Sequence, residues 1–305
     1  MRNCILHGDS LQLIKGIEDC TIHAIISDIP YGIGYDDWDV LHNNTNSAYG
    51  GASKAQLEAG PLYKRRGKPL NGWSEADKEI PLEYQKWCSS WASDWLRVLK
   101  PGGSCFIFAG RRFAHRCIIA LEDAGFTFKD MLAWEKATAL FRAQRLSVVF
   151  ERRDDTFNAK QWEGWRVANL RPTFEPILWF QKPYKIGGTI ADNVIENQVG
   201  AWNEAACYEY SKLENGLRTS NLIKVATDSS DFGKHVAQKP IKLMEYLISL
   251  VTIKGQVVLD PFVGSGTVCV AAKRLERDYI GIDKDLHNVE IANERLKSSY
   301  QTKLF

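Results

Sequence analysis

A loop near the C-terminus combines residue types that suit an adenosine-containing cofactor. Gly264 and Gly266 follow an apolar run at 256–259 and precede a helical pattern. Glycines leave the main chain open to a ligand, and the start of the following helix presents N–H groups to a carboxylate or phosphate. Asp283 ends the next predicted strand, where its carboxylate could accept both ribose hydroxyls. Position 269 is Cys269 rather than the third glycine of a dinucleotide fingerprint, which disfavours NAD; a plain tight turn is the alternative.

A second candidate site is the tetrapeptide Asp28-Ile29-Pro30-Tyr31. It follows the β-branched, apolar run 21–27, which predicts a buried strand that ends at the tetrapeptide. The ends of parallel strands are where open α/β proteins bind ligands. A strand-ending turn without function is the alternative. The two motifs can form one site only if their loops lie side by side.

Strands and helices alternate along both ends of the chain. Runs of β-branched and apolar residues predict strands, and apolar spacings of three and four predict helices. The predicted strands are 21–27, 104–109, 128–134, 256–259 and 279–282; the predicted helices run from Pro81 to the Lys100-Pro101-Gly102-Gly103 stop, over 111–124, 240–253 and 267–276, and from 285 onward. The tryptophans at 87, 91 and 95 share one helix face, which we interpret as core packing. The alternation predicts an α/β fold with a doubly wound, mostly parallel sheet and helices on both faces.

The composition is that of a folded globular protein. The 305 residues are 45% hydrophobic and 25% charged, which excludes a disulfide-stapled scaffold, a fibrous repeat and wholesale disorder. Lys and Arg number 39 against 37 Asp and Glu, so any polyanion site must be regional. The seven cysteines form no C-x-x-C pair, and His7, His23 and His235 lack metal-like spacing, so we expect no metal and a cytoplasmic location. No apolar run is long enough to span a bilayer, so we expect no membrane partner.

Three stretches lack clear periodicity. Regions 36–78 and 184–233 are rich in Gly, Asn, Ser and Thr, and loops of this length are usually functional or disordered. The first contains the basic cluster 64–68, which we interpret as a mobile basic arm. A solvated loop without function is the alternative. The third, 139–165, interleaves basic and aromatic side chains, a combination that suits phosphate contact and stacking on unpaired bases. Its members are Arg142, Arg145, Arg152, Arg153 and Lys160, with Phe141, Trp162 and Trp165.

The two motifs carry a resemblance to a known family. Asp28-Ile29-Pro30-Tyr31 resembles the D-P-P-Y motif, and residues 260–267 resemble the D-P-F-x-G-S-G-T loop, of the amino-methylating DNA methyltransferases. Their order, catalytic motif first and cofactor loop last, is similar to that of the β class. Looser matches are Gly8-Asp9-Ser10, Leu99-Lys100-Pro101-Gly102-Gly103, Glu175-Pro176-Ile177, Gln238-Lys239-Pro240 and Gly281-Ile282-Asp283. The resemblance implies the methyltransferase form of the doubly wound fold, with S-adenosylmethionine as cofactor and DNA as substrate.

The resemblance assigns methyl transfer to the tetrapeptide. The exocyclic amino nitrogen of a base is a poor nucleophile, because its lone pair is shared with the ring. The Asp28 carboxylate and the Ile29 carbonyl can accept its two N–H groups and direct the lone pair at the methyl group. Pro30 would hold that carbonyl, and Tyr31 would stack on a base turned out of the helix. Ile29 replaces the family's usual first proline, which keeps the acceptor but lowers local rigidity.

The first residue of the tetrapeptide also indicates the target base. Asp in that place resembles the enzymes that act on adenine N6, whereas Ser is commoner in those that act on cytosine N4. We therefore expect site-specific methylation of adenine N6. The alternatives are cytosine-N4 methylation, modification of RNA or of a protein amide by a related site, and a catalytically silent nucleic-acid-binding module that retains the cofactor pocket.

The same resemblance implies cofactor residues, domains and partners. The residues expected at the cofactor are Asp9, Lys239, Asp260, Phe262, Gly264, Ser265, Gly266, Thr267 and Asp283. Among these, Asp9 would reach the adenine ring and Lys239 the cofactor carboxylate; a surface turn and a solvent-facing lysine are the alternatives. A catalytic domain of 1–35, 79–183 and 234–305 would be joined by a basic loop insertion at 36–78 and a target recognition region at 184–233. A homodimer and a cognate restriction endonuclease are the candidate protein partners.

Overall fold

The computed structural model describes residues 1–32, 41, 75–136, 143–167, 169–210, 219–225 and 238–299. The basic cluster 64–68, most of the predicted insertion 36–78, and His235 lie outside the described residues. Phe141 and Arg142 also lie outside them, as do 211–218 and 226–233 of the predicted recognition region.

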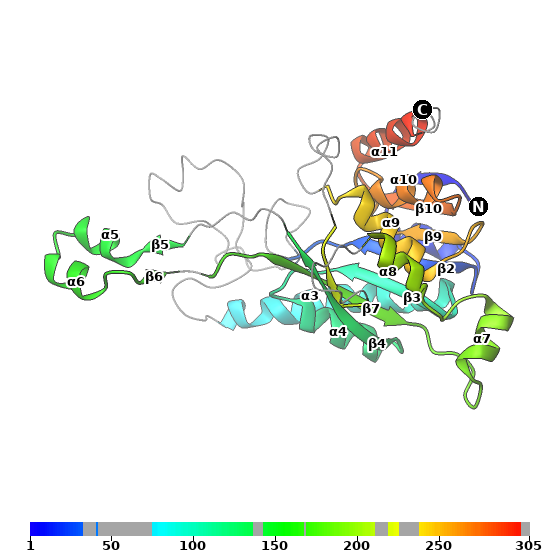
Figure 1. Cartoon of the computed structure of the whole chain (residues 1–305), viewed down its shortest axis with the longest axis horizontal. Coiled ribbons are helices and arrows are strands. Elements are labelled where there is room, and N and C mark those ends of the chain that lie inside the picture. The colour runs from blue at the N-terminus through cyan, green and yellow to red at the C-terminus, as the bar shows by residue number, and fades with distance from the viewer. Residues whose placement is uncertain are drawn as a thin grey trace.

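The core of the fold is an eight-stranded sheet in the order β1-β10-β9-β2-β3-β7-β4-β8 (Figure 1). The strands are β1 (Cys4–His7), β10 (Asp278–Asp283), β9 (Val257–Asp260), β2 (Ile22–Asp28), β3 (Leu99–Phe108), β7 (Phe174–Gln181), β4 (Thr127–Glu135) and β8 (Leu222–Ile223). Only β7 runs antiparallel to its neighbours, β3 and β4. The doubly wound, mostly parallel sheet is therefore confirmed.

Alternate side chains of each strand point to opposite faces of the sheet. Both faces therefore carry apolar side chains, and helices cover both. The helices are α1 (Ser10–Leu13), the 3-10 turn η1 (Ile14–Gly16), α3 (Glu75–Val98), α4 (Ala114–Asp123), α5 (Leu146–Glu151), α6 (Thr156–Gln161), α7 (Ile190–Asn197), α8 (Glu204–Tyr210), α9 (Ile241–Val251), α10 (Thr267–Arg274) and α11 (Leu286–Ser298). In β2, Ala24 and Ile26 belong to the apolar core shared with α9 and α10. Ile25, between them, belongs to the core shared with α3 and α4.

The helix α3 begins earlier than the sequence predicts. It starts at Glu75, so Pro81 lies inside it rather than at its start. A proline inside a helix removes one main-chain N–H donor, but Ile80 and Tyr84 on either side are each 1% exposed. Burial of these side chains extends the helix across the proline. The tryptophan stripe is core, as predicted, with Trp91 and Trp95 buried.

The helix α3 ends at Val98, just before the predicted stop at 100–103, and that stop segment also belongs to the irregular start of β3. Leu99 already pairs with Ile22, and the register of the two strands shifts between Ile22 and Ala24. Gly102 has a φ of +80°, which favours glycine. Backbone pairing with β2 therefore begins at the residue that follows α3.

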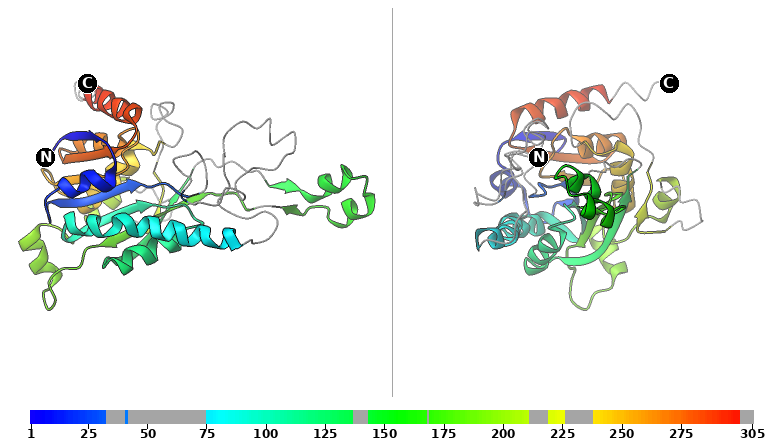
Figure 2. Two further views of the ribbon diagram at one scale, coloured as in Figure 1. Left: turned by 180° about the vertical axis from the view of Figure 1, so that it is seen from behind. Right: turned by 90° about the vertical axis from the view of Figure 1, so that its left-hand side faces the viewer.

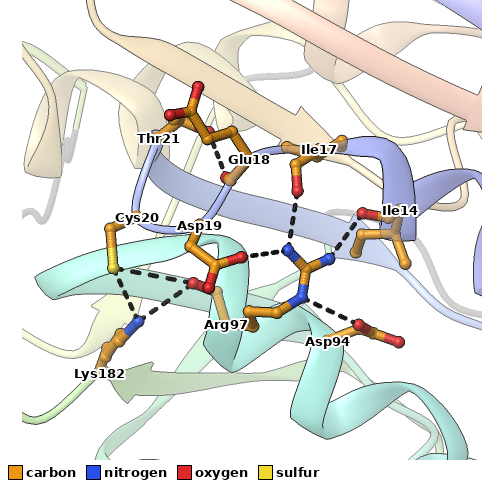
Figure 3. A network of polar contacts seen from close by, with 9 residues as sticks. All are labelled: Ile14, Ile17, Glu18, Asp19, Cys20, Thr21, Asp94, Arg97 and Lys182. Carbon is orange, nitrogen blue, oxygen red and sulfur yellow. Dashed lines mark hydrogen bonds and ion pairs between the residues drawn. The ribbon is translucent and has the colours of Figure 1, made fainter.

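Arg97 fastens the end of α3 to the segment that leads into β2 (Figure 3). Its guanidinium donates to the carbonyl oxygens of Ile14 (2.9 Å) and Ile17 (2.8 Å). It also forms ion pairs with Asp19 (2.5 Å) and Asp94 (3.2 Å). This side chain thus acts with the backbone hydrogen bonds from Cys20 and Thr21 to the end of α3, and together they hold the start of β2 in place.

The region 184–233 is more regular than the sequence predicts, because it contains α7, α8 and β8. A capping box formed by Thr189 and Asp192 starts α7. Asn193 of this helix donates to the Pro101 carbonyl (3.1 Å), at the amino end of β3. The short strand β8 pairs instead with the carboxyl end of β4.

Residues 143–167 form an arm that stands away from the sheet (Figures 1 and 2). A two-stranded stem pairs β5 (Gln144–Arg145) with β6 (Arg166–Val167), and α5 and α6 form the tip. The arm connects the carboxyl end of β4 to the start of β7. It therefore leaves the sheet at the edge where the parallel strands β2, β3 and β9 end.

In the part of the chain that the structure describes, none of the helices has the length and apolar character needed to cross a bilayer.

Candidate active site

The two sequence motifs follow adjacent parallel strands. Ile25 of β2 pairs with Leu259 of β9. The Ser27 hydroxyl donates to Asp260 Oδ1 at 2.7 Å, and both side chains are buried. The turn after β2 and the glycine loop after β9 therefore lie side by side, as a single site requires.

Asp28, at the end of β2, is held by two donors. The Lys239 ammonium lies 2.5 Å from Oδ2, and the Tyr31 hydroxyl donates to Oδ1 at 2.8 Å. The Lys239 ammonium also donates to the Tyr31 hydroxyl oxygen at 3.1 Å. The prediction placed Lys239 at the cofactor carboxylate, whereas the structure places its ammonium on Asp28.

A second carboxylate, Glu175 at the start of β7, faces the same donors. Its Oε1 lies 3.0 Å from the Lys239 ammonium and contacts the Tyr31 hydroxyl. Its Oε2 is paired with the Lys136 ammonium. Two carboxylates and two ammonium groups thus form a compact, charge-balanced cluster at the carboxyl edge of the sheet.

Burial and ion pairing act differently on the two carboxylates. Burial raises the pKa of Asp28, and the neighbouring Glu175 charge raises it further, against the opposing effect of Lys239. Burial would also raise the pKa of Glu175, but Lys239 and Lys136 together lower it to about 2. Burial would lower the pKa of Lys239, yet the two carboxylates raise it. Glu175 and Lys239 are therefore firmly charged, and Asp28 is the carboxylate that takes up a proton more readily.

The rest of the tetrapeptide is fixed by packing. Ile29 is 2% exposed and belongs to the core shared with α3 and α4. The Tyr84 hydroxyl of α3 donates to the Pro30 carbonyl at 3.2 Å. At Gly110 a Cβ atom would lie 2.9 Å from the Cβ of Tyr31, so glycine makes room for the base of that side chain. An apolar residue in the second position thus anchors the turn through the core.

The glycine loop is tied to the end of β10 through Asp283. The Gly264 N–H donates to Asp283 Oδ2 at 2.8 Å, and Oδ1 accepts from the Asp285 N–H at 2.9 Å. A Cβ atom at Gly264 would meet no atom within 4 Å. The main chain at Gly264 is therefore open to a ligand, next to a carboxylate that retains acceptor capacity.

Gly266 packs closely against a helix. Its φ is +83°, and a Cβ atom there would lie 2.7 Å from the Cβ of Ala292 in α11. The close approach of α11 therefore requires glycine at this position. The predicted cofactor residues Ser265 and Thr267 also face α11, where Arg295 donates to both hydroxyls at 2.9 and 3.0 Å.

The remaining predicted cofactor residues lie along the same edge. The Phe262 ring packs against those of Trp87 and Trp95, with ring centroids 5.8 and 6.1 Å apart. The Phe262 N–H donates to Asp260 Oδ1 at 3.2 Å. Burial raises the pKa of Asp260 to about 7. Asp9 caps α1 by accepting from the Leu11 N–H at 2.9 Å. It follows β1, the strand that pairs with β10, so all nine residues lie at one end of the sheet.

Comparison with known proteins decides which family has this arrangement. A model of the DNA methylase family matches residues 22–294. Type II methyltransferase M.HindIII of Haemophilus influenzae is 60% identical, over 97% of this chain and 96% of that protein. The chain belongs to the DNA methylase family. The methylase transfers a methyl group from S-adenosylmethionine to DNA.

A more distant relative agrees with this assignment, and two solved structures share the fold. Type II methyltransferase M2.DpnII of Streptococcus pneumoniae is 30% identical to the methylase, over 98% of this chain and 91% of that protein. The structure of M1.HpyAVI with SAM has a TM-score of 0.54 at 23% identity, covering 96% of this chain and 98% of that one. PvuII DNA methyltransferase, described as cytosine-N4-specific, has a TM-score of 0.61 at 17% identity, covering 97% of this chain and 86% of that one. At these identities the two structures show the fold alone.

Sequence reasoning missed three side chains of the methylase. Glu175 belongs to the loose match Glu175-Pro176-Ile177 and has no predicted role, although an acid beside the apolar run Pro176–Phe180 is a signal of a buried charge that needs a partner. Lys136 and Arg295 carry no local signal, because each contacts residues distant in sequence.

Proposed function

We propose that the methylase modifies N6 of adenine, with Asp28 and the Ile29 carbonyl as acceptors of the two amino N–H groups. The observation that carries the proposal is a partly exposed carboxylate next to the cofactor loop, joined to it through Ser27 and Asp260. S-adenosylmethionine supplies an electrophilic methyl group when it is bound. A carboxylate acceptor polarises the amino nitrogen toward that methyl group. Asp28 also acts as the general base, which accepts the proton that the amino nitrogen loses once it is methylated.

The remaining tetrapeptide residues position the base. Pro30 and the Tyr84 hydroxyl fix the turn, so the Ile29 carbonyl is presented in one orientation. The Tyr31 ring is the proposed stacking surface for a base that has left the duplex, and stacking offsets part of the cost of extrusion. Replacing Asp28 by Ala should therefore preserve cofactor binding and lower turnover by one to two orders of magnitude or more, since a charge-assisted hydrogen bond contributes about 1.5–3 kcal/mol.

Direct product analysis tests the choice of base. The methylase is incubated with duplex DNA and cofactor labelled in the methyl group, and the DNA is digested to nucleosides for mass spectrometry. We expect labelled N6-methyladenine. Label found only in N4-methylcytosine would reject the adenine assignment and would leave the role of Asp28 intact, because both bases present an exocyclic amino group.

We infer that the cofactor lies along the carboxyl ends of β9, β10 and β1. The open main chain at Gly264 suits the methionine part of the cofactor, and Asp283 the ribose hydroxyls. Asp9 is at the neighbouring strand end, within the edge that would hold the adenine ring. Asp260 and Phe262 support this surface from the β9 side, and Gly266, Ser265 and Thr267 hold the loop against α11.

The proposed DNA-contacting parts are 36–78, 184–233 and the arm. Within 184–233, α7 contacts the amino end of β3, opposite the edge that carries Asp28, so the proposed recognition role concerns the residues after α7. The arm leaves the sheet at the catalytic edge and exposes Arg152, Arg153 and Trp165. Cations and an exposed aromatic ring on one projection suit contact with duplex that flanks the target base.

Two partners and a location complete the proposal. A homodimer is expected from the resemblance to the β class, and sedimentation of the purified methylase tests it. A cognate restriction endonuclease would cut the same DNA sequence only when it is unmodified, so DNA treated with the methylase should resist that nuclease. Both activities act on cellular DNA, so we place the methylase in the cytoplasm.

A further inference from the structure

Lys239 and Tyr31 are each shared between the two carboxylates of the active site. The three N–H groups of the Lys239 ammonium have three acceptors, which are Asp28 at 2.5 Å, Glu175 at 3.0 Å and the Tyr31 oxygen at 3.1 Å. The Tyr31 hydroxyl contacts both Asp28 and Glu175. A phenol has a single proton to donate, so Tyr31 donates to one carboxylate at a time. Asp28 and Glu175 therefore compete for the same donors.

The two carboxylates differ in accessibility. The Asp28 side chain is 27% exposed, whereas Glu175 and Lys239 are 8% and 9% exposed. A base that enters the site reaches Asp28 and not Glu175. The amino group of that base brings new N–H donors to the Asp28 carboxylate, which already accepts hydrogen bonds from Lys239 and Tyr31.

We propose that Glu175 is a positioning residue that takes over the Lys239 and Tyr31 donors when the target amino group binds Asp28. This inference rests on the proposed role of Asp28. Both donors already contact Glu175, so the exchange requires shifts within existing contacts and leaves no buried ammonium without a partner. Lys136, on the other oxygen of Glu175, keeps that carboxylate in place.

The charge of Glu175 is what the exchange requires. An amide at this position can still accept a hydrogen bond, but it attracts an ammonium group less strongly than a carboxylate does. In the Glu175→Gln variant the Lys239 ammonium should stay on Asp28 and obstruct the incoming amino group. We expect kcat to fall at least tenfold, with the dissociation constant of the cofactor unchanged.

A double-mutant cycle tests whether Glu175 acts through Lys239. The variants are Glu175→Gln, Lys239→Met and the pair, which removes one charge of each sign. Single-turnover rates are measured at saturating DNA and cofactor, and calorimetric cofactor titration with thermal melting checks the fold. Adding Glu175→Gln to Lys239→Met should lower the rate by a clearly smaller factor than adding it to the wild-type protein, because only the Tyr31 donor is then left for Glu175 to take over. The matched control is Glu135→Gln, a surface carboxylate at the end of β4 that is paired with Lys224 at 3.5 Å; it should behave as wild type.

The pH profile separates this role from a purely structural one. The groups that face Asp28 are Tyr31, Lys239 and Glu175, with Asp260 acting from the neighbouring strand. Removing the Glu175 charge removes a like charge, so the acid limb of kcat should move to lower pH. Removing the Lys239 charge should move it to higher pH. If Glu175→Gln fails to fold, Glu175→Asp keeps the charge at a shorter reach and should lower kcat without moving the limb.

Wild-type rates in Glu175→Gln, or losses that multiply in the double variant, would overturn the inference. These outcomes are distinct from failure of the proposed function. That failure appears in the wild-type protein, either as label on cytosine alone or as a fully active Asp28→Ala variant.

Discussion

Replacing Asp260 by Asn tests whether the buried carboxyl that joins the two motifs is neutral in the folded protein. Its hydrogen bonds from Ser27 and from the Phe262 N–H both reach Oδ1, so an amide oxygen can accept both. Burial raises the pKa of Asp260 from 3.8 to about 7. Between these values the folded protein holds a proton that the unfolded chain has lost. The unfolding free energy should therefore fall as the pH rises through this window.

The expected magnitude follows from the size of the pKa shift. Each pH unit well inside the window costs about 1.4 kcal/mol, and the loss between pH 5 and 7 is about 2 kcal/mol, because the slope flattens near the folded pKa. Asp260→Asn cannot titrate and lacks this dependence, while the other groups titrate alike in both proteins. Urea unfolding of the two proteins at several pH values from 5 to 8 gives the difference directly. A difference that is constant across this range would show that Asp260 is ionised in the folded state, and the reasoning from burial would be wrong.

Three further predictions concern the scaffold, the cofactor loop and the arm. Arg97→Ala should lower the unfolding free energy by about 2–3 kcal/mol in urea titrations, because two carbonyls and two carboxylates lose their donor; an unchanged midpoint would contradict the anchoring role. Gly266→Ala should destabilise by about 2–5 kcal/mol through its clash with Ala292 and its positive φ, whereas Gly264→Ala should cost only about 1–2 kcal/mol and mainly weaken cofactor binding by calorimetry; equal stability losses would refute the distinction. Replacing Arg152 and Arg153 by Gln should reduce the slope of log K against log salt by roughly 2 on a long duplex and leave binding to a duplex that covers only the target site unchanged; loss on both duplexes would argue against flanking contact.

The secondary structure was predictable where local pattern and tertiary packing agree. The β-branched run at 21–27 and the breaker that follows it correspond to β2 and its end at Asp28. Pro81 misled the prediction because burial of Ile80 and Tyr84 outweighs the loss of one hydrogen bond. The Thr189–Asp192 capping box was a readable signal for α7 in a region that its composition alone marked as irregular.

The site was predictable as far as its two motifs extend, and no further. Asp28 and the glycine loop are contiguous in sequence, so their residue types indicate chemistry by themselves. The contact between Lys239 and Asp28 joins residues 211 positions apart, and local pattern carries no information on such a pairing. For Gly266 the sequence predicts that glycine matters, but it does not predict the contact with Ala292. That contact depends on how α11 packs, which the local sequence does not specify.

The strand order explains why one site forms from motifs at opposite ends of the chain. After β9 the chain continues to β10, on the side of the sheet that ends in β1; after β2 it continues to β3, on the other side. The loops that leave β9 and β2 therefore diverge, and this is the position at which open α/β sheets bind ligands. The two motifs need not be close in sequence, because backbone pairing between β2 and β9 makes their strands neighbours in the sheet. Other neighbouring strands do not meet this condition in the same way: β3 and β7, for example, are antiparallel, so the loops that follow them leave opposite edges of the sheet. The bond from Ser27 to Asp260 is thus a direct consequence of where the chain reverses its direction of winding.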